Sequence, residues 1–246
     1  MGFIVAVGGG ENGWGGSEYE LLKADEEIIR LANKPDPVLL FIGFAAPKPD
    51  EYFQIVKQIF TKYNCRFIHL DEQACKNGDA PALISQADIV YVGGGSTKML
   101  LSLMREYGLE DHLVSAYERG AVLCGVSAGA NCWFSYGNAR GIPQKDGTPQ
   151  SSPVEGLGLL DIVYCPHIVR DPFRHDSMRD FLRTHPEKTG IEIDYAALEI
   201  MDGSFRIIPL DDRAKAIKVW WNGSVPEEEM IPRDKFMPID CLLLKP

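Results

Sequence analysis

The sequence predicts an α/β fold: a doubly wound, mostly parallel sheet with antiparallel strands near the C-terminus. Through the first half of the chain, short apolar runs alternate with longer amphipathic stretches. This is the pattern of a parallel sheet covered by helices on both faces. Several of the apolar runs end in glycines, which suit sharp turns between a strand and a helix. After residue 191 the apolar runs follow one another without intervening helices.

The first half of the chain contains four apolar runs that are expected to be buried strands. Stretches with apolar residues at helical spacing come between them. Ser17 is placed to cap the first helix, and Pro35 and Pro37 end it. The predicted strands cover residues 3–7, 38–44, 66–70 and 88–92, and the predicted helices cover residues 17–33, 49–62, 80–86 and 97–106, with a further helix ending near 119.

The second half departs from this alternation. Residues 137–153 are rich in Gly, Pro, Gln and Ser, and this length predicts a functional loop instead of a simple connection. A strand at 162–165 and a helix at 172–185 follow. Later strands, joined in part by Asp-Gly and Asn-Gly turns, indicate an antiparallel extension of the same sheet; they cover residues 197–201, 205–209 and 216–221. No linker divides the chain, so residues 1–246 are expected to form one domain.

Composition restricts the partners of the protein. The 246 residues carry a formal net charge of −10 at pH 7, which argues against nucleic acid or an anionic membrane as partner. The apolar N-terminus lacks the basic region of a signal peptide, and no apolar run approaches membrane-spanning length. The six cysteines show no metal-site spacing, and several lie within apolar runs. We therefore expect a protein of the reducing cytoplasm.

No cofactor and no metal are expected. Gly8, Gly10 and Gly13 match the spacing of the dinucleotide-binding fingerprint. The acidic residue that should follow the second strand is missing, since apolar residues stand at 44–46. Tight turns are sufficient to explain the glycines. The histidines and carboxylates form no metal-ligand motif such as H-E-x-x-H.

Residues 121–134 have the features of a nucleophile elbow. A strand-forming run ends at Gly125, and Gly125-x-Ser127-x-Gly129 leads into a helix-permissive stretch. The glycines let the two backbones approach, and the amide after the serine can hold an oxyanion. The alternative is a tight turn in which Ser127 only caps the helix. Cys124 falls inside the strand, where core packing is its expected role.

A nucleophilic serine needs a base, and His167 is the best placed of five histidines. It directly follows Pro166 at the end of a predicted strand, whereas the others lie within a strand (His69) or in helical stretches (His112, His175 and His185). Because parallel strands end at one edge of a sheet, Ser127, His167 and the glycine turns after residues 7 and 92 are expected to meet there. The alternative is a structural or solvated histidine.

Three segments, taken in order, carry a resemblance to a known family. They read VGGGS from Val92, GVSAGAN from Gly125 and Pro-His at 166–167. Together they resemble the peptidase E family of serine peptidases, which includes aspartyl dipeptidase and the cyanophycinases. That family is similar in its flavodoxin-like fold to the class I glutamine amidotransferases, whose elbow carries cysteine at the position of Ser127.

The resemblance implies a function and a set of site residues. Ser127 would be the nucleophile, His167 the general base, and the amides of Gly95 and Ala128 the oxyanion hole. The substrate would be a short peptide, with an N-terminal aspartate held by an arginine. Counting along the helix makes that arginine Arg174, with Arg170 and Arg179 as nearby alternatives. The family also suggests a homodimer.

One departure from the family pattern concerns the third member of the triad. The family carries a glutamate there, and Tyr195 takes its place in the segment Ile191-Glu-Ile-Asp-Tyr195. A tyrosine can orient a neutral imidazole but brings no full negative charge. Asp194 is adjacent and would face the other side of a regular strand unless a bulge rotated it. The alternatives are therefore a slow or substituted peptidase, a silent binding relative, and a hydrolase of other amides or esters.

Overall fold

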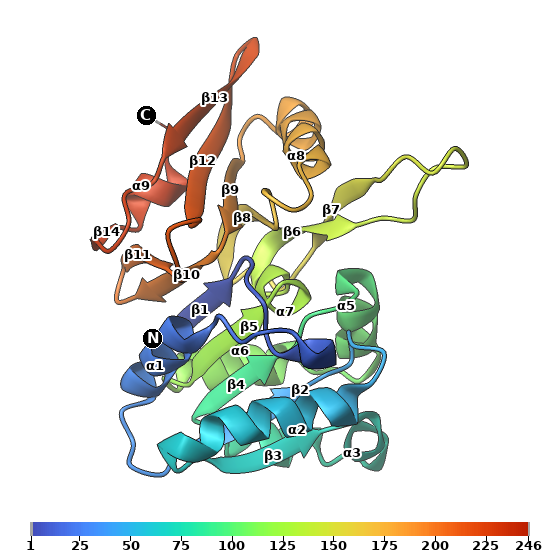
Figure 1. The fold of residues 1–246 in the computed structure, drawn as a ribbon, viewed down its shortest axis with the longest axis vertical. Helices are drawn as coiled ribbons and strands as arrows, with labels where there is room; N and C mark the ends of the chain where they lie inside the picture. Colours follow the sequence, from blue (N-terminus) through green and yellow to red (C-terminus); the bar gives the residue numbers. More distant parts are fainter. Residues whose placement is uncertain (1, 246) are drawn as a thin grey trace.

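The computed structural model describes residues 2–245 and contains two β-sheets surrounded by helices (Figure 1). The larger sheet has eight strands in the order β14-β11-β10-β1-β5-β4-β2-β3. The smaller has six in the order β13-β12-β9-β8-β6-β7. The predicted α/β class is confirmed.

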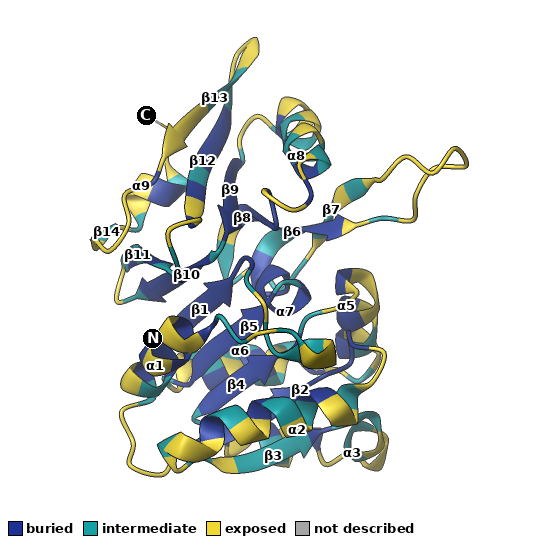
Figure 2. Ribbon diagram, in the orientation of Figure 1, coloured by how far each residue is buried: buried dark blue, intermediate teal, exposed yellow. Residues whose placement is uncertain are grey.

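Five strands of the larger sheet are parallel, and helices cover both of its faces. The strands are β1 (Phe3–Val7), β2 (Val38–Ile42), β3 (Arg66–Leu70), β4 (Ile89–Val92) and β5 (Val122–Val126). Helices α1 (Leu22–Ala32) and α2 (Pro49–Phe60) pack on one face, and α4 (Ala80–Ser85), α5 (Thr97–Glu106) and α6 (Glu110–Glu118) pack on the other. Four of these strands are buried, the edge strand β3 is only partly buried, and the outer faces of the helices are exposed (Figure 2). The predicted doubly wound arrangement is therefore present.

Antiparallel strands extend this sheet beyond β1. They are β10 (Ala196–Met201), β11 (Ser204–Pro209) and the short β14 (Met237–Pro238). The prediction that residues 216–221 join the same sheet was wrong, because β12 (Lys215–Asn222) pairs with β9 (Thr189–Asp194) in the smaller sheet. The backbone of Tyr195 is left-handed, with φ of 49°, so the chain turns sharply between β9 and β10. The two strands consequently enter different sheets.

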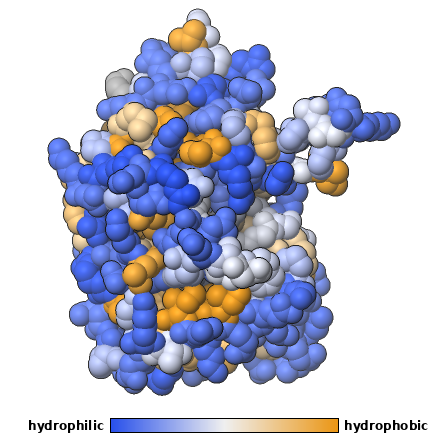
Figure 3. Space-filling view, viewed as in Figure 1, coloured by the Kyte–Doolittle hydropathy of each residue, from blue (hydrophilic) through white to orange (hydrophobic). Residues whose placement is uncertain are grey.

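The remaining strands of the smaller sheet are β6 (Phe134–Arg140), β7 (Ser151–Glu155), β8 (Leu160–Pro166) and β13 (Val225–Met230). The prediction of a loop over residues 137–153 was wrong at both ends, since β6 and β7 pair as an antiparallel hairpin and only its tip is irregular. β6 is largely buried and also pairs with β8, whereas the end of the hairpin projects from the body as an arm with a mostly hydrophilic surface (Figures 1 and 3).

Three further helices complete the second half. They are α7 (Ala128–Asn131), α8 (Phe173–Thr184) and α9 (Asp240–Leu243). Sequence patterning missed α3 (Glu72–Asn77), whose first turn is capped by the Asp71 carboxylate, which accepts from the Ala74 amide at 2.7 Å. No helix within residues 2–245 has both the length and the apolarity needed to cross a membrane.

The predicted start of the first helix at Ser17 was also wrong. Helix α1 begins at Leu22, and the residues before it form a small hairpin that includes a 3-10 turn, η1 (Trp14–Gly16). Asn12 and Tyr19 form an antiparallel bridge across this hairpin. Four glycines with positive φ, at 10, 13, 15 and 16, allow its tight turns.

Candidate active site

Ser127 lies at the tip of a sharp turn between β5 and α7. Its backbone has φ of 56° and ψ of −104°, a conformation that few residues other than glycine adopt. The turn is held by a hydrogen bond from the Ser127 amide to the carbonyl of Val7 on the neighbouring strand, at 3.0 Å. The carbonyl of Ser127 in turn accepts from the amides of Ala130 and Asn131. Surrounding structure therefore maintains a strained backbone at this residue.

The two flanking glycines are required by close backbone contacts. A Cβ on Gly125 would lie 2.4 Å from the carbonyl oxygen of Gly129. One on Gly129 would lie 2.0 Å from the carbonyl oxygen of Val92 on β4. No side chain can occupy either space, so the elbow turn depends on glycine at both positions.

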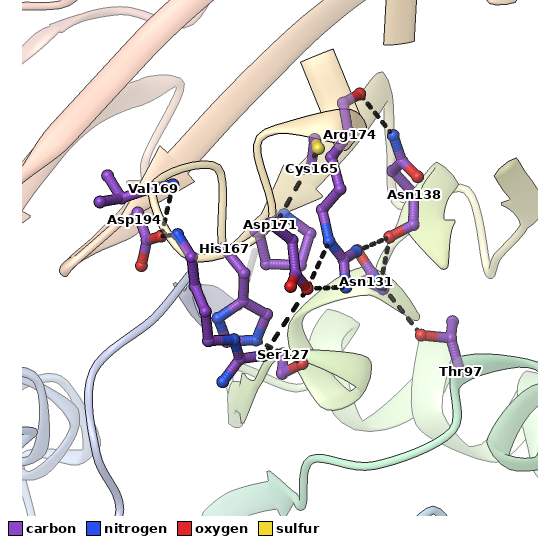
Figure 4. Close-up of polar contacts among 12 residues, drawn as sticks. Thr97, Ser127, Asn131, Asn138, Cys165, His167, Val169, Asp171, Arg174 and Asp194 are labelled. Atoms are coloured by element: carbon purple, nitrogen blue, oxygen red, sulfur yellow. Dashed lines mark hydrogen bonds and ion pairs between the residues drawn. The ribbon is translucent and has the colours of Figure 1, made fainter. Parts of the chain in front are cut away.

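The imidazole of His167 faces the hydroxyl of Ser127 from the other sheet (Figure 4). Its Nε2 lies 2.8 Å from the Ser127 Oγ, a hydrogen-bonding distance. His167 follows β8, and its own amide bonds to the carbonyls of Gly8 and Ile193, at 2.9 and 3.1 Å. These bonds fix the start of the histidine loop, residues 167–172, over the elbow. The contact brings together a residue from each sheet.

The surroundings of His167 favour a neutral imidazole. His167 is only 6% exposed. Burial first, and then the nearby charges of Arg170, Arg174 and Arg140, hold the pKa of His167 well below its usual value. A neutral ring can accept the serine proton through Nε2, so the arrangement is chemically suited to general-base catalysis.

Two amides with free donor capacity border the serine. Ala128 is the first residue of α7, so its N–H has no acceptor within that helix. Within residues 2–245, the amide of Gly95 likewise donates to no protein group. Gly95 has φ of 137°, and a Cβ there would lie 1.9 Å from the carbonyl oxygen of Ala45. Such paired donors can stabilise an oxyanion.

The two candidates for a third triad member lie in different places. The guanidinium carbon of Arg213 is 3.9 Å from the centre of the Tyr195 ring. The Asp194 carboxylate accepts from the amides of Val169, at 2.9 Å, and Arg170, at 3.4 Å, in the histidine loop. Within the part of the chain that the structure describes, neither side chain hydrogen-bonds to His167. Asp194 thus contacts the loop that carries the imidazole, whereas Tyr195 contacts an arginine.

The arginines named from the sequence have different surroundings. Arg174, on α8, is buried, and its guanidinium bonds to the Asp171 carboxylate at 3.1 and 3.2 Å and to the Asn138 carbonyl at 2.6 Å (Figure 4). Arg170 is exposed, with a longer contact of 3.9 Å to Asp171. Arg179 pairs with Glu228 on β13. Only Arg170 and Arg174 of these three line the cavities beside Ser127.

Two cavities meet at Ser127. The first, which we call the Asn131 cavity, has a volume of about 280 Å³ and is bordered by Asn131 and Thr97. The second, the Trp14 cavity, has a volume of about 360 Å³ and is bordered by Trp14 and His167. Both share Gly95, Ser127, Arg140 and Arg174. These volumes lie close to the lower end of the range of typical ligand pockets, ~300–1,000 Å³, which suits a short substrate.

Sequence reasoning missed Arg140 and the hairpin residues Asn12 and Trp14, all of which border a cavity with Ser127. The only available signal for Arg140 was a cation inside the segment that we interpreted as a functional loop. The signal for the hairpin was an aromatic residue within a glycine-rich stretch.

Cys124 is fully buried in β5, where burial raises its pKa well above the usual value. Residues 2–245 contain no cluster of three or more His, Cys, Asp or Glu side chains that could hold a metal ion.

The chain is similar to known proteins in sequence and in fold. The sequence model described as "Peptidase family S51" matches residues 4–208. The chain is 31% identical to the uncharacterized peptidase YgaJ of Bacillus subtilis over 218 residues, covering 88% of this chain and 91% of that protein. It is 28% identical to peptidase E of Streptomyces coelicolor, covering 80% of this chain and 79% of that protein. The crystal structure of a peptidase from an acI-B1 actinobacterium superposes with a TM-score of 0.70, at 20% identity and 97% coverage of both chains, so it is similar in fold.

Proposed function

The chain belongs to peptidase family S51 and is a serine-type peptidase, and from this premise we propose that it hydrolyses short peptides with Ser127 as nucleophile and His167 as general base. The observation that carries the proposal is the 2.8 Å contact between the His167 Nε2 and the Ser127 Oγ. This contact occurs at a strained turn, beside two amides with free donor capacity. These are the parts that acyl transfer through a serine requires.

The proposed mechanism has two acyl-transfer steps. The Ser127 oxygen attacks the scissile carbonyl carbon while His167 takes the hydroxyl proton. The amides of Gly95 and Ala128 donate to the oxyanion that forms. The C–N bond then breaks, and His167 gives its proton to the departing amine. A water molecule, deprotonated by His167, attacks the acyl-serine, and the released acid leaves Ser127 protonated again.

We propose that the residue on the acyl side has an acidic side chain. Arg140 and Arg174 border the Asn131 cavity, and no acidic side chain does. Arg174 already bonds to Asp171 and to a carbonyl, which uses part of its donor capacity. Arg140 is exposed at the end of β6 and has no ion pair within residues 2–245. A substrate carboxylate would therefore find one free guanidinium and one that is partly neutralised.

The third group is proposed to be Asp194, acting as a positioning residue. Its carboxylate holds the backbone amides of Val169 and Arg170, and so supports the histidine loop. No carboxylate within residues 2–245 hydrogen-bonds to the imidazole, so the imidazolium formed during catalysis lacks a directly bonded negative charge. Replacing the carboxylate that bonds the imidazole costs about 10⁴-fold in a well-studied triad, and we expect slow turnover here.

Labelling with a fluorophosphonate tests the nucleophile without assuming a substrate. We expect wild-type protein to be labelled on Ser127 and the Ser127→Ala protein to remain unlabelled. Ser85→Ala, on the exposed face of α4, is the matched control and should label as the wild type does. Labelling that persists in Ser127→Ala would exclude this serine as the nucleophile.

A panel of dipeptides, matched esters and peptides lacking an acidic residue tests the substrate. Faster hydrolysis of peptides that begin with aspartate would support the acidic acyl-side residue, whereas hydrolysis of esters alone would assign a different hydrolase activity.

We further propose that residues 1–246 act as one domain, since Ser127 and His167 come from different sheets. The cytoplasmic location and the homodimeric state stay predictions, the latter testable by light scattering.

A further inference from the structure

The hairpin formed by residues 11–20 borders the Trp14 cavity, which His167 also borders. Its ends are joined by a hydrogen bond from the Glu20 amide to the Glu11 carbonyl, at 2.8 Å. The Asn12 side chain accepts from the Trp14 amide at 3.2 Å, which turns the chain so that Trp14 borders the cavity. The hairpin is therefore an ordered wall of the cavity, built by its own local bonds.

Tyr52 connects this hairpin to the glycine turn beside the serine. Its hydroxyl accepts from the Asn12 side-chain amide at 2.8 Å and from the Gly94 amide at 3.5 Å. Its ring packs edge-on against Trp14, with 5.3 Å between centroids. Tyr52 is only 2% exposed, so its position is set by the core. Trp14 is thereby held in a defined place relative to Ser127.

The position of His167 distinguishes the two cavities. In serine acyl transfer the histidine donates its proton to the departing amine, so the leaving group must lie on the histidine side of the serine. His167 borders the Trp14 cavity and not the Asn131 cavity. The acyl-side residue accordingly belongs in the Asn131 cavity, and the departing residue belongs in the Trp14 cavity.

Arg170 is the second feature found only in the Trp14 cavity. Its side chain is 56% exposed, and among residues 2–245 the guanidinium contacts only the carboxylate of Asp171, at 3.9 Å. Its backbone amide, within the histidine loop, donates to the Asp194 carboxylate at 3.4 Å. Three arginines border this cavity against one carboxylate, that of Glu11. An exposed guanidinium in a cationic cavity is a binding group for a carboxylate.

We propose that the Trp14 cavity is the subsite for the departing residue of a dipeptide, in which Arg170 pairs with the free α-carboxylate and Trp14 contacts the side chain. This inference rests on the proposed function, because it takes Ser127 and His167 as the reacting pair. It adds a physical reason for cleaving dipeptides in preference to longer peptides: a blocked C-terminus removes the charge that Arg170 binds, and an extended one moves that charge away from Arg170.

Binding to the inactive Ser127→Ala protein tests the carboxylate contact apart from turnover. Calorimetry should find aspartyl-leucine bound about 5- to 10-fold more tightly than its C-terminal amide, an effect expected of a partly exposed ion pair. Adding Arg170→Gln should remove this difference, and Arg170→Lys should retain part of it. Arg183→Gln, which removes an exposed arginine of α8 outside both cavities, is the matched control. Equal affinity for acid and amide, or no binding of either, would overturn the inference.

The Trp14 contact is tested by comparing two departing residues in otherwise wild-type protein. Trp14→Ala should raise KM for aspartyl-leucine about 10-fold with little effect on aspartyl-glycine, and Trp14→Phe should restore most of the loss. Thermal melts verify that the variants are folded. An equal effect on both substrates would contradict a side-chain subsite. A wild-type protein that hydrolyses neither dipeptide would instead count against the proposed function, while the calorimetric comparison would still decide the carboxylate contact.

Discussion

Replacing Gly95 with alanine is the sharpest perturbation of the proposed oxyanion hole. The new Cβ would lie 1.9 Å from the carbonyl oxygen of Ala45, whereas ordinary contacts begin near 3.4 Å. The difference is 1.5 Å, so one of the two segments must move by about that distance. The Ala45 carbonyl is itself bonded to the Ser96 amide at 3.0 Å, which resists its movement. The glycine turn, and the amide of Gly95 within it, should therefore shift away from the serine.

The size of the effect follows from this displacement. A misplacement of ~1 Å at a reacting centre can cost about 10²-fold in rate. Complete loss of one oxyanion donor costs about 10²- to 10³-fold, or ~3–4 kcal/mol in activation free energy. We therefore expect Gly95→Ala to lower kcat for peptide hydrolysis, and the rate of fluorophosphonate labelling, by about 10²- to 10³-fold.

The control separates this effect from backbone strain alone. Gly120 also has a positive φ, of 96°, but a Cβ there meets nothing within 4 Å. Gly120→Ala should lower stability slightly and leave labelling unchanged. A Gly95→Ala protein that melts cooperatively and still labels and hydrolyses at the wild-type rate would refute the assignment of this amide.

Three further predictions concern protonation and positioning. Because the pKa of His167 is held well below its usual value, kcat/KM should fall on the acid side only below pH 6.5. A bound anionic substrate offsets the arginine charges and raises the pKa of His167, so kcat should fall at a higher pH than kcat/KM does. Burial raises the pKa of Asp25 to about 7, so its contribution to the free energy of unfolding falls as pH rises from 5 to 8. In urea titrations, Asp25→Asn should reduce this fall in the free energy of unfolding by about 2–3 kcal/mol. An unchanged dependence of the free energy of unfolding on pH would contradict the prediction. Asp194→Ala should lower kcat at least 10-fold by releasing the histidine loop, whereas Tyr195→Phe should change kcat less than 2-fold; the reverse order would favour the tyrosine as the group that orients the imidazole.

The sequence predicted those parts of the fold whose signal is local. The parallel strands β1, β2, β4 and β5 are buried on both faces, so each appears as a continuous apolar run, whereas the edge strand β3 is only partly buried. The elbow was recognisable because two close backbone approaches admit only glycine at positions 125 and 129. The hairpin arm was not recognised, because β6 and β7 carry no apolar alternation, although β6 is largely buried and also pairs with β8.

The sequence by itself determined the α/β class and the family, and it predicted a serine and a histidine that lie within hydrogen-bonding distance in the structure. Only the tertiary structure decided which groups surround them, because those groups come from distant segments with no shared local pattern. Arg140 comes from β6, Trp14 comes from the N-terminal hairpin, and the left-handed turn at Tyr195 directs Asp194 toward the histidine loop. The direction of the Asp194 side chain at this turn depends on how the two sheets pack against each other, and that packing exists only in the folded chain.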